Sequence, residues 1–224
     1  MRVLVTGGSS GLGCAVATEV VRRRGRPFVL DLVPPALDVD HLEVDLADRL
    51  AAEQAVESAA SAMGGVDAVV TAAGIDACGP LADVPADRWE RVVAVNLLGT
   101  AAVIRTALPH LIASRGRVVT VASTLGLRAL PEASAYCASK FGVVGLTRAL
   151  QAELTGKVAF TLLVPGGMRT AFFDGREEKY RPGADATLSD PRVVADAVLY
   201  ALTRPPGTEL RELVLTPEHE PSWP

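Results

Sequence analysis

A tyrosine and a lysine four positions apart have the types and spacing for proton transfer. Tyr136 and Lys140 lie in a stretch that predicts a helix, so their side chains share one helix face. A free tyrosine, with a pKa near ~10, is a poor base at neutral pH. A neighbouring ammonium favours the phenolate and lowers that pKa, so the pair predicts a tyrosine that accepts or donates a proton. Taken alone, such a pair is often only a surface contact.

A glycine-rich turn near the start of the sequence predicts a phosphate site. The apolar run 2–6 leads into Thr6-Gly7-Gly8-Ser9-Ser10-Gly11-Leu12-Gly13, and a helical pattern follows. Glycines permit a tight turn and let the backbone approach a pyrophosphate, whose charge faces the N–H groups and dipole of the helix N-terminus. Gly-Ser turns are common, so the strand–turn–helix context carries this interpretation.

An acidic residue further along supports a dinucleotide at that turn. Asp31 ends the second predicted strand, where a carboxylate can accept hydrogen bonds from the ribose hydroxyls of adenosine. The same carboxylate would repel a 2′-phosphate, and Leu32 beside it offers no cation. The pattern therefore favours NAD over NADP. The alternative is that Asp31 only caps the strand end.

Short apolar runs alternate with longer helical patterns along the whole chain. Such β-α-β repeats predict a doubly wound α/β domain of the Rossmann type over residues 1–224, with a seven-stranded, mainly parallel sheet. The strands are expected at 2–6, 27–31, 41–44, 67–71, 117–122, 158–164 and 212–215. The helices are expected at 12–24, 48–63, 86–113, 135–154 and 193–203. The polar stretch 171–190 is expected to be a substrate loop.

In this order, the motifs resemble the short-chain dehydrogenase/reductase family, in its branch of small single-domain subunits, over nearly the whole chain. The family's catalytic serine corresponds to Ser123, thirteen positions before Tyr136, and its YxxxK pair to Tyr136 and Lys140. Its active-site asparagine corresponds to Asn96. The resemblance implies that Ser123 stabilises charge on the substrate oxygen. It also implies that Asn96 holds a helix carbonyl and a water, extending a proton path from Lys140.

The cofactor motifs of the family are present, with one departure. TGxxxGxG corresponds to 6–13 and PGxxxT to 165–170, whereas NNAG appears only as Thr71-Ala72-Ala73-Gly74. The missing second asparagine usually ties the central strand to its neighbours. The cofactor-binding residues that the resemblance implies are Gly7, Ser9, Ser10, Gly11, Leu12, Gly13, Asp31, Leu32, Asp45, Leu46, Ala72, Ala73, Gly74, Tyr136, Lys140, Pro165, Gly166, Met168 and Thr170.

The resemblance also implies a largely apolar substrate pocket. Besides Ser123 and Tyr136, its expected walls are Leu125, Leu130, Met168, Phe172 and Phe173. Arg128 and Arg169 are the only nearby cations expected. Apolar walls penalise an unpaired carboxylate or phosphate, so we expect a neutral, mostly hydrophobic secondary alcohol or ketone, with 171–190 closing over it. The alternative is that the two phenylalanines only anchor the loop to the core.

Composition excludes several other classes of function. The chain has 224 residues and a net charge of −4, which predicts neither nucleic acid nor an anionic membrane as a partner. No run of about 18 uninterrupted apolar residues predicts a membrane span, and no signal-peptide pattern begins the chain. The three histidines lie near no acid or cysteine cluster, so no metal site is predicted. Three scattered cysteines fit reduced thiols, and we expect a cytoplasmic protein.

Two alternative functions stay open at this point. One is an NADPH-dependent carbonyl reductase, in which Asp31 does not decide the cofactor. The other is a non-catalytic dinucleotide-sensing protein, although such proteins typically lose the tyrosine or lysine that this chain keeps. The resemblance implies a homodimer or homotetramer built through the long helices that bear Asn96 and Tyr136. Small residues on the second of these helices permit close packing, which is equally a core pattern: Ala138, Gly142, Gly145 and Ala149.

Overall fold

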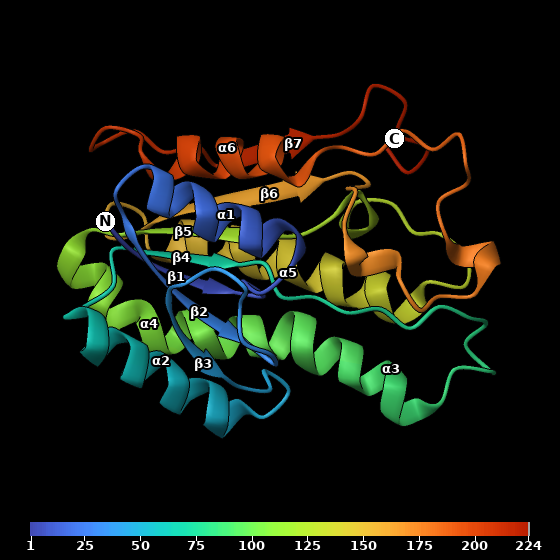
Figure 1. The fold of residues 1–224 in the computed structure, drawn as a ribbon, viewed down its shortest axis with the longest axis horizontal. Helices are drawn as coiled ribbons and strands as arrows, with labels where there is room; N and C mark the ends of the chain where they lie inside the picture. Colours follow the sequence, from blue (N-terminus) through green and yellow to red (C-terminus); the bar gives the residue numbers. More distant parts are fainter. Residues whose placement is uncertain (224) are drawn as a thin grey trace.

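Seven parallel strands pair in the order β3-β2-β1-β4-β5-β6-β7 (Figure 1). The computed structural model describes residues 1–223. The strands are β1 (Arg2–Thr6), β2 (Arg26–Asp31), β3 (Asp40–Glu43), β4 (Ala68–Thr71), β5 (Arg117–Val121), β6 (Ala159–Pro165) and β7 (Glu212–Leu215). The predicted Rossmann-type class and its seven strands are confirmed. The central strands β1, β2, β4, β5 and β6 are apolar runs buried on both faces, whereas the edge strands β3 and β7 are largely exposed.

Helices cover both faces of this sheet (Figure 1). They are α1 (Gly11–Arg22), α2 (Arg49–Met63), α3 (Ala86–Val93), α4 (Thr100–Ser114), α5 (Ser134–Glu153) and α6 (Pro191–Leu202). On one face α1 and α6 pack together, burying Val16, Val20, Val198 and Leu199 against β1, β4 and β5. On the other face α2 and α4 pack together over a core that includes Leu4, Ile104 and Phe160.

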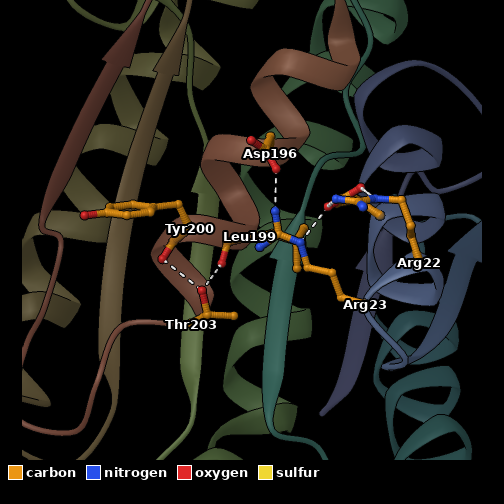
Figure 2. Close-up of polar contacts among 7 residues, drawn as sticks. Arg22, Arg23, Asp196, Leu199, Tyr200 and Thr203 are labelled. Atoms are coloured by element: carbon orange, nitrogen blue, oxygen red, sulfur yellow. Dashed lines mark hydrogen bonds and ion pairs between the residues drawn. The ribbon is translucent and has the colours of Figure 1, made fainter.

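The contact between α1 and α6 also has a polar rim (Figure 2). Arg23, just past the end of α1, donates to the carboxylates of Glu19 and Asp196, the latter on α6. The Thr203 hydroxyl donates to Leu199 O at 2.7 Å and closes the last turn of α6. Exposed ion pairs contribute only about 0–1 kcal/mol, so the buried apolar residues hold this layer together.

The expected helix 86–113 is continuous but changes from α-helical to π-helical geometry over one segment. Between α3 and α4, residues Ala94–Gly99 form a π-helical segment, which the apolar pattern did not predict. A Cβ at Gly99 would lie 2.7 Å from Leu46 O, so the helix approaches the backbone closely there. By length and composition Ala86–Ser114 could span a membrane, although buried core helices meet the same criterion. Here α4 lies on the sheet, and its residues Val103 and Ile104 are in the core.

The carboxyl ends of the parallel strands gather the predicted site at one edge of the sheet. The glycine turn follows β1, Asp31 ends β2, and Ala72–Gly74 follow β4. Ser123 follows β5, and the segment 165–170 begins at the end of β6. Strand order reverses at β1, which pairs with both β2 and β4, and ligands bind beside such a switch point in open α/β sheets.

Candidate active site

The turn after β1 has the form of an anion cradle. Gly7 has φ +69°, and a Cβ there would lie 2.7 Å from the backbone of Ala73. A Cβ at Gly13 would lie 2.1 Å from Gly7 O, so only glycine fits at this position. Ser10 stands at the N-cap of α1, and within residues 1–223 its side chain makes no capping hydrogen bond. The first N–H groups of the helix are thus suited to bind a pyrophosphate.

Asp31 is fixed beside this cradle. Its carboxylate accepts hydrogen bonds from Ser9 N at 2.8 Å and from Leu32 N at 2.7 Å. Each carboxylate oxygen keeps a further lone pair for a ribose hydroxyl. Leu32 is 53% exposed and brings no positive charge. The Asp31 carboxylate is therefore held where it can accept hydrogen bonds from the hydroxyls of an adenosine ribose.

Asp45 has a partner that the sequence did not reveal. Its carboxylate accepts from Ala47 N at 2.9 Å and from Arg91 Nη2 at 2.9 Å. Burial alone would raise the pKa of Asp45, but these two hydrogen bonds and the charge of Arg91 lower it below its usual value. Leu46, the next residue, is buried in the core. The carboxylate expected at the adenine is thus already engaged by α3.

Thr6 partly replaces the missing family asparagine at the end of β4. Ala72 N donates to Thr6 O at 3.2 Å, and Ala73 N donates to Thr6 Oγ1 at 3.3 Å. Thr71 is buried, and among the described residues its hydroxyl has no hydrogen-bond partner. A Cβ at Gly74 would lie 3.6 Å from both Asn96 Oδ1 and Lys140 Nζ, so this glycine borders two of the predicted site residues.

The structure brings Ser123, Tyr136 and Lys140 together. Ser123 caps the short 3-10 helix Thr124–Gly126, and its hydroxyl accepts from Leu125 N at 3.1 Å. Tyr136 lies in the first turn of α5, close enough to Ser123 for their hydrogen bond to lower its pKa. Lys140, one turn further, places Nζ 5.6 Å from the centre of the Tyr136 ring. Its ammonium donates to Val121 O at 2.8 Å, which ties α5 to the end of β5.

The expected lowering of the Tyr136 pKa is not found. Burial raises the pKa of Tyr136, the nearby Asp76 carboxylate raises it further, and hydrogen bonding to Ser123 and the charge of Arg176 only partly oppose this. Burial also lowers the pKa of Lys140, to about 8. A spacing of four residues brings the ammonium close to the phenol, but it does not show that both groups are desolvated by burial. The phenol is therefore protonated at neutral pH.

Asn96 makes different contacts from those expected. It lies in the π-helical segment and is 1% exposed. Its Oδ1 accepts from Ile75 N at 2.8 Å, while Nδ2 donates to Ile75 O at 2.9 Å and to Ser139 Oγ at 3.0 Å. Both Nδ2 protons are therefore used by Ile75 O and by α5, while Oδ1 keeps one further lone pair. The carbonyl that the side chain holds is that of Ile75, which follows β4, and not a helix carbonyl as expected; the water on the path from Lys140 stays a prediction.

The loop 171–190 carries a cation near Tyr136, Arg176, that was not predicted from the sequence. The Phe172 ring lies 5.5 Å from the Tyr136 ring, and the Arg176 guanidinium stacks on Phe172 at 4.6 Å and on Phe173 at 4.7 Å. Arg176 Nη2 lies 3.0 Å from Asp76 Oδ2, with the two side chains 16% and 8% exposed. This pair thus holds the loop 171–190 beside Tyr136.

The other expected pocket residues lie less centrally. Leu130 is 40% exposed, and Arg169 is exposed. Arg128 is exposed and donates to the backbone carbonyl of Pro221. The expectation that Arg128 and Arg169 are the only cations near the pocket is wrong, because Arg176 stacks on Phe172 beside Tyr136. Leu125 and Met168 are half-buried. A pocket of about 560 Å³ opens beside Thr170 and Phe173, under residues 181–188.

Two signals in the sequence pointed to the missed pair. Asp76 follows Gly74 by two positions at a strand end, where functional groups of this fold gather. Arg176 follows the two phenylalanines by three and four positions in a loop already expected to meet the substrate. Neither signal says that the two charges meet, because a loop's path is set by tertiary contacts.

Comparison with known proteins decides the family. The family model described as short chain dehydrogenase matches residues 1–181. The chain belongs to the short-chain dehydrogenase/reductase family. It is therefore an enzyme of a family whose members use NAD(P) to oxidise alcohols or reduce carbonyl groups.

Individual relatives differ in what their names say they act on. A 2-dehydro-3-deoxy-L-rhamnonate dehydrogenase (NAD(+)) of a Sphingomonas species is 36% identical over 182 residues, which cover 76% of this chain and 73% of that protein. A glycine betaine reductase of Emericella nidulans is 31% identical over 97% of this chain, but the chain spans only 19% of its length. A structure of an actinorhodin polyketide ketoreductase variant with NADPH superposes with a TM-score of 0.84 at 26% identity, covering 95% of this chain and 94% of that one.

Proposed function

We propose that this short-chain dehydrogenase/reductase is NAD(H)-dependent and transfers a hydride between nicotinamide and a secondary alcohol or ketone. The observation that carries the proposal is the meeting of Ser123, Tyr136 and Lys140 at the edge of the sheet that also holds the glycine cradle. Segment 165–170 is the counterpart of the family's nicotinamide-binding segment. When bound, the nicotinamide supplies or accepts the hydride.

The protein's own part is to move one proton. In reduction, Tyr136 donates its phenolic proton to the substrate oxygen, and Ser123 donates a hydrogen bond to the charge that develops there. The raised pKa of Tyr136 keeps the phenol protonated at neutral pH, which suits this direction. In oxidation the phenolic oxygen of Tyr136 must lose its proton before it can accept one from the alcohol. Alkaline pH therefore favours the oxidation. Lys140, with a pKa of about 8, titrates in the range where it can relay that proton.

NAD is proposed over NADP on the evidence of Asp31. Its carboxylate is held by Ser9 N and Leu32 N at the position suited to ribose hydroxyls, where a phosphate would be repelled. Replacing Asp31 with Ala and Leu32 with Arg should narrow or reverse the ratio of kcat/KM for NAD(H) over NADP(H). Each tenfold change in the ratio corresponds to ~1.4 kcal/mol. A wild-type preference for NADP(H) would instead favour the alternative carbonyl reductase.

An uncharged substrate is proposed from the surroundings of Tyr136. Phe172 offers an aromatic surface, and the charge of Arg176 is already balanced by Asp76. A carboxylate would have to compete with Asp76 for the guanidinium and pay for its own desolvation. Measuring kcat/KM for an apolar ketone and its carboxylated analogue tests this proposal. Faster reduction of the acid would show that Arg176 recognises substrate charge.

The decisive experiment is a turnover assay over a panel of secondary alcohols and ketones. Oxidation or reduction of the nicotinamide is followed by its absorbance, with NAD(H) and NADP(H) in parallel. We expect turnover with NAD(H). Cofactor binding without turnover on any panel member, in a protein with Tyr136 and Lys140 intact, would favour the dinucleotide-sensing alternative.

A homodimer or homotetramer is proposed through the π-helical segment and α5. Leu98 is 59% exposed and Phe141 45% exposed, and space is open around Gly145. Such apolar exposure on neighbouring helices suits an interface between copies. Light scattering after size exclusion measures the mass, and Phe141→Glu should shift it to the monomer.

We also propose a cytoplasmic location, supported by the free cysteines Cys14, Cys78 and Cys137, and fractionation of cells tests it.

A further inference from the structure

Residues 217–223, which follow β7, cross the active-site edge of the sheet and contact two loops there. The Glu220 carboxylate accepts from Gly167 N at 2.7 Å, inside the segment 165–170. Ser222 Oγ and Thr124 Oγ1 are 2.6 Å apart, and Thr124 directly follows the catalytic Ser123. Arg128 Nη1 adds a bond to Pro221 O at 3.2 Å. This C-terminal strap (residues 217–223) therefore joins the loop after β5 to the loop after β6.

The hydrogen bonds of the strap form one directed chain. Ser222 Oγ lies 2.6 Å from Glu220 Oε1, an acceptor only, so the serine proton points to the carboxylate. Thr124 must then donate to Ser222. Because each hydroxyl donates onward, the chain runs from Thr124 through Ser222 to Glu220, where Gly167 N donates from the other side. Bonds to a charged acceptor are stronger than neutral ones, and chained hydroxyls reinforce one another.

Close packing shows that Glu220 bears directly on the backbone of this segment. A Cβ at Gly166 would lie 2.3 Å from Glu220 Oε2 and 2.9 Å from Pro217 Cδ. Thr124, at the other end of the chain, is only 2% exposed. The carboxylate thus sits against two successive backbone units, and its far end is anchored on a buried side chain.

We infer that Glu220 is a positioning residue that holds segment 165–170, and with it the nicotinamide end of the cofactor, in register with Ser123. This inference rests on the proposed cofactor site. Glu220 touches neither the glycine cradle nor Asp31, which are suited to the adenosine and pyrophosphate end. Its loss should therefore weaken contacts to one end of the dinucleotide only.

Binding of two ligands by the full chain separates this role from a general structural one. NAD⁺ reaches both ends of the site, whereas ADP-ribose lacks the nicotinamide, and calorimetry gives a Kd for each. In Glu220→Ala we expect about tenfold weaker NAD⁺ binding, in the range of a hydrogen bond to a charged group, and ADP-ribose binding within twofold of wild type. Glu220→Gln keeps a hydrogen-bond acceptor but loses the charge, so its Kd for NAD⁺ should lie between those of wild type and Glu220→Ala. Glu218→Ala, an exposed residue of the same strap, should change neither value.

The contrary outcomes are distinct. NAD⁺ binding within twofold of wild type in Glu220→Ala overturns the inference, and so does an equal loss for both ligands. A wild-type chain that binds neither ligand overturns the proposed function instead. Gly166→Ala supplies a second measurement, since its new methyl group would press on Glu220. The effects of Gly166→Ala and Glu220→Ala on NAD⁺ binding should then be less than additive. Full additivity would mean that the two residues do not act through one contact.

Discussion

Replacing Asn96 with alanine should destabilise the fold and, with it, the edge of the sheet where the candidate site lies. The amide satisfies three groups: the N–H and C=O of Ile75 and the hydroxyl of Ser139. Ser139 keeps its bond to Tyr136 O, so the alanine variant leaves mainly the two Ile75 backbone groups unpaired. A buried unpaired group costs about 1–3 kcal/mol, and because Ile75 is only half-buried we take the lower part of that range. The expected loss is about 2–4 kcal/mol.

Denaturant titration and thermal melting measure this loss. In a domain of this size, 1 kcal/mol corresponds to about 2–4 °C, so Tm should fall by about 5–15 °C. Ser139→Ala is the matched control, because it removes one bond to Asn96 and leaves Ile75 paired; it should cost about 1 kcal/mol. Since Asp76 follows Ile75, kcat/KM should fall in Asn96→Ala at a temperature where the variant is folded. A stability within about 0.5 kcal/mol of wild type would refute the reasoning, because water would then replace the amide.

Three further predictions concern the residues around Tyr136. Tyr136→Phe should lower turnover by about 10²–10⁴-fold with NAD⁺ binding unchanged, and activity within a few-fold of wild type would contradict its role as the proton carrier. Burial holds the pKa of Lys140 at about 8 against 10.5 when unfolded, so the folded state carries a desolvation cost below pH 8 that fades as pH rises to 10.5. Lys140→Met should therefore be more stable than wild type at pH 7 by about 1–2 kcal/mol, after allowance for the lost hydrogen bond to Val121 O. This gain in stability should disappear near pH 10.5. Denaturant titrations across this pH range measure it, and a difference that does not depend on pH would argue against the prediction. Asp76→Asn leaves the Arg176 charge unbalanced, so limited proteolysis should cut the loop 171–190 faster than in wild type. Asp174→Asn, at an exposed position on the same loop, should be cut at the wild-type rate. Equal cleavage rates for Asp76→Asn and wild type would mean that the Asp76–Arg176 pair does not anchor the loop.

Local patterns in the sequence determined the architecture and the identity of the chemical groups. The five central strands β1, β2, β4, β5 and β6 are buried on both faces and read as apolar runs, whereas the edge strands β3 and β7 are largely exposed and were predicted from the alternation of strands and helices. The turn from Gly7 to Gly13 is dictated by backbone geometry, because a Cβ at Gly13 would meet Gly7 O at 2.1 Å. Tyr136 and Lys140 could be found because one helix turn fixes their spacing, and Ser123 was identified through the resemblance to the family's motif order.

Only the tertiary structure decided the electrostatics of the site and its distant partners. The Tyr136 pKa rises because burial outweighs nearby favourable contacts, and burial is not a property of a four-residue spacing. Asn96 contacts Ile75, 21 positions earlier, because a π-helical segment turns its amide toward β4's end. Asp76 meets Arg176 across 100 residues, and Glu220 meets Gly167 across 53. Such contacts arise where separate loops converge at one sheet edge, and no local period in the sequence records them.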